Sequence, residues 1–111
     1  MTLPGGEHAI IDPQKLRDYV LSRMHPVGRF KAAFFASLGY EIDNWQDLDR
    51  ALRTAASQAE AEPEERTTYG QKYRIRSMLG GPGERSAEIV SVWIVLHDET
   101  TPRLVTVWPG R

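Results

Sequence analysis

The sequence Lys72-Tyr73-Arg74-Ile75-Arg76 alternates charged and apolar side chains at every step. This is the two-residue period of a β-strand that buries only one of its faces. Further along, residues 89–96 are apolar except for Ser91 and are rich in β-branched residues, which is also typical of a strand. A glycine-rich turn lies between the two, and a last strand over 103–108 follows a loop at 97–102. Residues 69–109 are therefore predicted to form an antiparallel β-meander.

The apolar residues upstream of this region follow the 3.6-residue period of helices instead. Asp12 and Pro13 are typical of an N-cap and a first helical position, and they predict a helix over 13–21. A second helix is expected over 27–38, stopped by Gly39, and a third is expected after an Asp43 cap. The residues predicted to be buried in the second and third helices are Phe30, Phe34, Phe35, Leu38, Trp45, Leu48, Leu52 and Ala55.

The predicted fold class is α+β, with N-terminal helices packed on one face of a C-terminal antiparallel β-meander. Residues 1–111 are expected to form one domain, made of a helical layer (12–59), an acidic linker (60–68) and the sheet (69–109). The linker is predicted from its four glutamates and from Pro63, which cannot continue a helix.

Composition excludes several classes of function. The chain has no cysteine, and its three histidines are far apart, so neither a metal site nor a cofactor is expected. No apolar run is long enough to span a membrane, and a cytoplasmic location is expected. Residues 1–65 carry 7 basic and 11 acidic side chains, whereas residues 66–111 carry 7 and 4, so an anion would be attracted to the C-terminal half.

The lengths of the two loops predict the register of the meander. A four-residue turn at 81–84 would align Tyr73 with Val92, and the loop at 97–102 would align Val92 with Val107. The residues expected to face the helices are then Tyr73, Ile75, Val90, Val92, Ile94, Val105 and Val107. The residues expected on the open face are Lys72, Arg74, Arg76, Ser91, Trp93, Thr106 and Trp108.

The open face predicted in this way combines cations, hydroxyl groups and two indoles. Arginine and lysine bind phosphate oxygens, and tryptophan offers a flat surface on which bases stack. The same mixture is also found where tryptophans are buried in a dimer interface, so a second copy of the chain is an alternative partner.

Two further side chains are candidates for chemistry. His25, in a loop between helices, has the residue type of a general acid or base, although a histidine there is also commonly a capping or packing residue. Lys31, among phenylalanines, could contact a phosphate or extend from the core toward solvent.

Several segments match, in order, a small bacterial domain of unknown function, family 6883. They are residues 9–16 (AIIDPQKL), 25–28 (HPVG) with Lys31-Ala32, 69–73 (YGQKY) and 102–106 (PRLVT). The chain resembles this family over nearly its whole length. The family is found alone and at the C-termini of polymorphic toxins and phage head-morphogenesis-type proteins. Its layout is similar to that of ribonuclease toxins of the barnase, EndoU, colicin and RelE group.

The resemblance implies a metal-independent ribonuclease and carries functional positions onto His25, Lys31, Tyr73, Arg103 and Thr106. Together with the open face, the expected catalytic residues are His25, Lys31, Arg74 and Thr106. The expected substrate-binding residues are Lys72, Tyr73, Ser91, Trp93, Arg103 and Trp108. The expected partners are an RNA substrate and a cognate antitoxin or immunity protein.

A second class of function stays open at this point. The chain could be a non-catalytic interaction module, such as an antitoxin, an accessory protein or a phage-related structural domain. The sequence pI of about 6.3 favours this alternative, because free-standing ribonuclease toxins are often basic.

Overall fold

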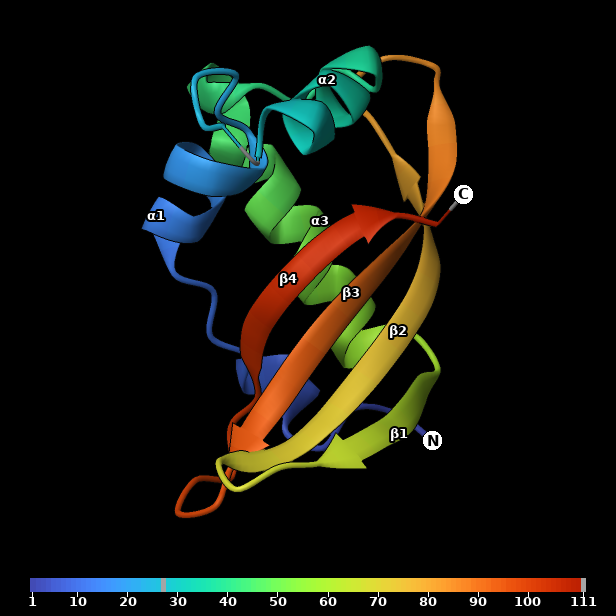
Figure 1. Cartoon of the computed structure of the whole chain (residues 1–111). Helices are drawn as coiled ribbons and strands as arrows, with labels where there is room; N and C mark the ends of the chain where they lie inside the picture. Colours follow the sequence, from blue (N-terminus) through green and yellow to red (C-terminus); the bar gives the residue numbers. More distant parts are fainter. Residues whose placement is uncertain (27, 111) are drawn as a thin grey trace.

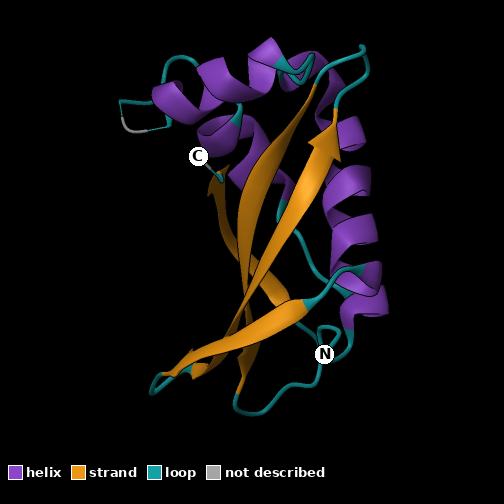
Figure 2. Ribbon diagram, turned by 90° about the vertical axis from the view of Figure 1, so that its right-hand side faces the viewer, coloured by secondary structure: helices purple, strands orange, loops and turns teal. Residues whose placement is uncertain are grey.

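The computed structural model describes all residues of the chain except 27 and 111. Its centre is a four-stranded antiparallel sheet in the order β1 (Ala61–Arg66), β2 (Gly70–Gly80), β3 (Ser86–Leu96) and β4 (Arg103–Pro109). The helices lie on one face of this twisted sheet and at one of its ends (Figures 1 and 2). The predicted α+β class, with N-terminal helices on one face of an antiparallel meander, is confirmed.

The first helical segment begins as the sequence predicts. The carboxylate of Asp12 accepts a hydrogen bond from the Gln14 amide at 2.9 Å, and Pro13 occupies the first helical turn. After one turn the helix widens into a π turn, in which the Leu21 amide donates to the Leu16 carbonyl at 2.8 Å. The helical elements are η1 (Gly6–His8), α1 (Pro13–Lys15), η2 (Leu16–Val20, the π turn), α2 (Arg29–Ser37), η3 (Ile42–Asn44) and α3 (Trp45–Gln58).

Three of the four core residues predicted for the second helix pack as expected, since Phe34 too lies partly buried against the core. Phe35 and Leu38 are buried as expected, but Phe30 is 70% exposed, so its place in the buried stripe was predicted wrongly. Gly39 ends the helix with φ of 98°, a left-handed conformation that favours glycine, as predicted. The expected start of this helix at Val27 lies outside the described residues.

Helix α3 buries Leu48, Leu52 and Ala56. The predicted cap at Asp43 is wrong, because the 3₁₀ turn η3 precedes α3 and Asn44 stands at its N-cap. The side chains of Glu41 and Asn44 close η3 in a reciprocal capping box, which a single capping aspartate could not do.

The acidic segment expected to be a linker is in fact strand β1. Ala61 is buried opposite Ile75, and Glu62 lies opposite Arg74 of β2. Pro63 is compatible with this position because β1 is an edge strand, where a missing amide is tolerated. The prediction of a linker is wrong because the glutamates of β1 form ion pairs with Lys72 and Arg74 of β2, and composition alone does not reveal this pairing.

The register predicted for β3 is wrong by one residue. Tyr73 lies opposite Trp93 and Ile75 opposite Ser91, because the hairpin pairs Gly80 with Ser86 across a five-residue loop rather than a four-residue one. Strand β4 pairs Val107 with Ser91 and carries an irregularity at Val105, opposite the step from Val92 to Trp93. The residues of β3 that face the helices are therefore Ile89, Ser91 and Trp93, and those on the open face are Val90, Val92 and Ile94.

Burial of one large side chain explains this register. Trp93 is fully buried in the core, and its indole Nε1 donates to the buried Ser91 hydroxyl at 3.0 Å. The slip leaves β2 in place, so its cations still point away from the helices. On the open face, Val90 is buried because it lies between Arg76 and Trp108 of the flanking strands.

Candidate functional site

One lysine links the helical layer to the edge of the sheet. Lys31 extends from α2 to β4, where its Nζ donates to Thr106 Oγ1 at 2.9 Å. The same Nζ lies 5.1 Å from the ring centroid of Tyr19, which the π turn η2 carries. Two of the residues predicted to be catalytic, far apart in the sequence, are thus in direct contact.

His25 belongs to the same group of side chains. Its ring lies 4.7 Å from that of Tyr19, in an edge-to-face arrangement with an interplanar angle of 71°. The Gly28 amide donates to His25 Nδ1 at 3.0 Å, so a neutral imidazole in this geometry carries its proton on Nε2. We refer to Tyr19, His25, Lys31 and Thr106 as the Lys31 site.

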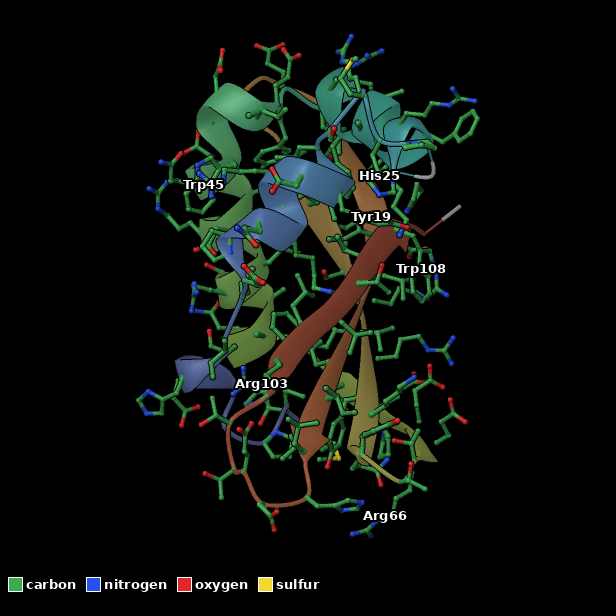
Figure 3. All side chains as sticks on the ribbon, turned by 60° about the vertical axis from the view of Figure 1, so that its left-hand side comes forward. Tyr19, His25, Trp45, Arg66, Arg103 and Trp108 are labelled. Atoms are coloured by element: carbon green, nitrogen blue, oxygen red, sulfur yellow. The ribbon has the colours of Figure 1, made fainter. Side chains whose placement is uncertain are left out.

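The Lys31 site lies where β4 ends. Tyr19 and His25 are found at this end of the molecule together with Trp108, whereas Arg103 lies at the start of the strand (Figure 3). A surface pocket of about 470 Å³ is lined by Tyr19, Lys15 and Thr106 among others. The pocket therefore reaches the Lys31 site at Tyr19 and Thr106, along the outer edge of the sheet.

Lys15, Asp12 and Asp18 line this pocket, and Lys31 reaches it through its contact with Thr106. Burial lowers the pKa of Lys31, and the charge of Lys15 lowers the pKa of Lys31 further. Lys15 donates to the carbonyl of Val105 at 2.9 Å, the residue that the β3–β4 register skips. Among the described residues, no carboxylate forms an ion pair with Lys31 within 4.0 Å, although Asp12 and Asp18 line the same pocket.

The cations of β2, by contrast, are each matched by a glutamate. These ion pairs are Lys72–Glu65 at 3.7 Å, Arg74–Glu64 at 3.4 Å and Arg76–Glu88 at 2.8 Å. The open face is therefore far less cationic than its β2 residues alone suggest. Arg74, predicted to be catalytic, is separated from Thr106 by β3, at about 10 Å across two strand spacings.

Other predicted site residues do not reach the Lys31 site. Ser91 and Trp93 were expected on the open face, and this was wrong because the register turns both into the core. Tyr73 also packs against the core, opposite Trp93. Arg103 forms two hydrogen bonds with Glu99, at 2.9 and 3.0 Å, and these raise its pKa and lower that of Glu99.

Two groups of residues at the site were not predicted from the sequence. Tyr19 lies within the segment predicted as an ordinary helix over 13–21, and only the π turn, which adds one residue to a turn, gives its side chain a special position. Glu64 and Glu65 were assigned to a linker. A signal was available for them, since four glutamates precede a strand with three cations.

Gly28 sets how closely the His25 loop packs on η2. A Cβ atom on Gly28 would run into the carbonyl oxygen of Tyr19, so only glycine fits this close approach. The glycine of the HPVG motif therefore holds His25 and Tyr19 together.

We expect Gly28→Ala to destabilise the domain by about 1–3 kcal/mol, the usual cost of forcing an extra carbon into packed structure. Urea unfolding of the variant would measure this loss. Gly83→Ala is the matched control, because a Cβ at Gly83 meets nothing within 4 Å. Equal stabilities of the two variants would contradict the packing described here.

Within the described part of the chain, no cluster of three or more His, Asp or Glu side chains could hold a metal ion. In the same residues, no helix is long and apolar enough to cross a membrane.

Comparison with known proteins finds a similar structure and a matching family. No curated protein matches the sequence. Among solved structures, the fold is similar to a chain of the contact-dependent growth inhibition toxin–immunity protein complex from Klebsiella pneumoniae 342, with a TM-score of 0.70 and 19% identity. The match covers 92% of this chain and 100% of that one. The sequence matches the family described as a domain of unknown function (DUF6883) over residues 2–111, and this chain therefore belongs to that family.

Proposed function

We propose that this chain is the RNA-cleaving domain of a toxin–immunity system, and that the Lys31 site is its reaction centre. The contact between Lys31 and Thr106 carries the proposal. It places a partly buried cation beside a hydroxyl at the rim of an open pocket. The similarity to a chain of a toxin–immunity complex supports the biological setting.

The reaction we propose is transesterification within the RNA backbone. The ribose 2′-oxygen attacks the adjacent phosphorus and its proton passes to water. The bond from phosphorus to the 5′-oxygen breaks, leaving a 2′,3′-cyclic phosphate and a 5′-hydroxyl. The Lys31 ammonium group balances the negative charge that develops on the phosphoryl oxygens, and its lowered pKa makes it a better proton donor to the departing 5′-oxygen.

The other residues of the site orient these groups. Thr106 accepts a hydrogen bond from Lys31 and holds the ammonium at the pocket rim. His25 packs edge to face on Tyr19 and keeps that ring beside Lys31, whereas use of His25 as a general base at Nδ1 would require loss of the Gly28 contact. Arg74, held by Glu64 beyond β3, is left out of the proposed reaction centre.

The test is cleavage of a single-stranded RNA by purified protein in the presence of EDTA. We expect cleavage that leaves 2′,3′-cyclic ends, and we expect His25→Ala to slow it strongly. Intact RNA after prolonged incubation, with protein shown to be folded by its unfolding transition, would contradict the proposal.

The ion pairs of β2 favour a second candidate, a non-catalytic binding module. Neutralised cations attract phosphate weakly, and such a surface suits a protein partner better than RNA. A folded protein that neither cleaves nor binds RNA, but protects cells from a co-expressed toxin of the same locus, would support this candidate.

A further inference from the structure

We infer that the pocket beside Trp108 is a base-recognition subsite that selects guanine in single-stranded RNA; this inference rests on the proposed RNA-cleaving function. The Trp108 pocket, of about 290 Å³, is lined by Glu64, Glu65, Lys72, Val92, Val105, Thr106 and Trp108. Its size is at the lower end of the range for ligand sites, which suits one base rather than a longer segment.

The Trp108 pocket adjoins the Lys31 site. Val105 and Thr106 line both this pocket and the one that contains Lys15 and Tyr19, so the two hollows meet at the same two residues of β4. A nucleotide could therefore place its phosphate near Lys31 while its base enters the Trp108 pocket. The subsite would set which nucleotide stands next to the cleaved bond.

The pocket has an aromatic residue and an apolar one suited to a base. Trp108, partly exposed on β4, offers an indole face, and Val92 is 7% exposed on the neighbouring strand. Stacking on an aromatic side chain is the usual way in which proteins hold an unpaired base, and it does not discriminate between bases. Selectivity must therefore come from the polar groups of the pocket.

The polar groups form a pattern that matches one base. Glu65 Oε1 lies 3.7 Å from Lys72 Nζ, so a carboxylate that accepts hydrogen bonds stands next to an ammonium group that donates them. Guanine presents two adjacent donors, N1–H and the N2 amino group, followed by the O6 acceptor. The carboxylate can accept from both donors while the ammonium group donates to O6.

The other bases fit this pattern less well. Adenine and cytosine each offer one amino donor beside a ring nitrogen that accepts hydrogen bonds. This nitrogen would face a carboxylate oxygen, which is also an acceptor, so no hydrogen bond could form between them. Uracil has a single N–H between two carbonyl oxygens. Each mismatched edge would leave a carboxylate oxygen without its hydrogen bond in the bound complex.

The irregular pairing of β1 makes this arrangement possible. The register with β2 shifts between Pro63 and Arg66, and the two consecutive glutamates inside that shift both line the pocket. In a regular strand, neighbouring side chains point to opposite faces. Glu64 is held by Arg74, and Glu65, with its side chain 72% exposed, has a single ion pair among the described residues, the loose contact with Lys72. A base can replace such a surface pair at small cost.

The experiment measures the binding of guanosine, adenosine, cytidine and uridine 3′-monophosphates, together with cleavage of oligonucleotides that differ at one base. We expect guanosine 3′-monophosphate to bind at least about 10-fold more tightly than the others. Glu65→Gln should remove this preference, and Trp108→Ala should weaken binding of all four nucleotides. Glu62→Gln is the matched control, because Glu62 lies on the same strand but does not line the pocket.

The outcomes separate the two proposals. Cleavage of RNA with no preference among bases, or a preference that survives Glu65→Gln, would overturn the guanine subsite and leave the ribonuclease proposal standing. Guanosine 3′-monophosphate binding that depends on Glu65, without cleavage of any RNA, would support the subsite and overturn the reaction proposed for the Lys31 site.

Discussion

Replacement of Lys31 by methionine is expected to slow RNA cleavage by about 100- to 1,000-fold, the usual cost of losing one preorganised group that stabilises transition-state charge. Methionine keeps much of the length and apolar contact of the lysine stem, so the fold should be retained. The matched control is Arg29→Met, which removes the same charge from the exposed part of the same helix. Equal cleavage rates for the two variants would exclude Lys31 from the reaction.

The alkaline limb of the activity gives a second measurement on Lys31. The pKa of Lys31 is lowered from its ordinary value of 10.5 by burial and by Lys15. A cation with a lowered pKa loses its proton at a lower pH than usual, so cleavage by the wild-type protein should fall on the alkaline side below pH 10.5. Removal of the Lys15 charge, in Lys15→Met, should move this limb to higher pH.

Replacement of Trp93 by alanine is expected to destabilise the domain by about 3–5 kcal/mol. The side chain is fully buried, and its loss would open a cavity and leave the buried Ser91 hydroxyl without its indole donor. Urea unfolding would measure the loss, with Trp108→Ala as the control on the open face. Because the two variants make the same change on opposite faces of the sheet, equal losses would contradict the register of β3.

The features that could be predicted from the sequence are those that depend only on residues close together in the chain. The Asp12 cap needs only the amide of Gln14, and the stop at Gly39 needs only a left-handed backbone. Each of these features is encoded within a few residues, so a local pattern is enough to predict it.

The faces of β3 could not be predicted in the same way. Residues 89–96 are apolar at nearly every position, so alternation does not say which set faces the helices. The choice then depends on loop length and on the burial of Trp93. A five-residue hairpin loop in place of a four-residue one was enough to reverse the strand.

The candidate site could be predicted in part, chiefly where its residues are close together in the sequence. His25 and Lys31 lie close together in the sequence, and the structure brings Lys31 to Thr106 of β4. Tyr19 was missed because an ordinary α-helix was assumed where the chain forms a π turn. The glutamates of β1 were missed because their role depends on a strand that follows them and pairs with them.

The two edges of the sheet are closed to other strands by different means. Strand β1 has a proline and several carboxylates along its outer edge, and equal charges on two copies would repel each other. Along β4, the backbone of Ile10 pairs with residues at the start of the strand, and Lys15 donates a hydrogen bond to the Val105 carbonyl. A long, strongly β-forming sheet is thereby protected from pairing edge to edge with a second copy of the domain, the first step toward fibres.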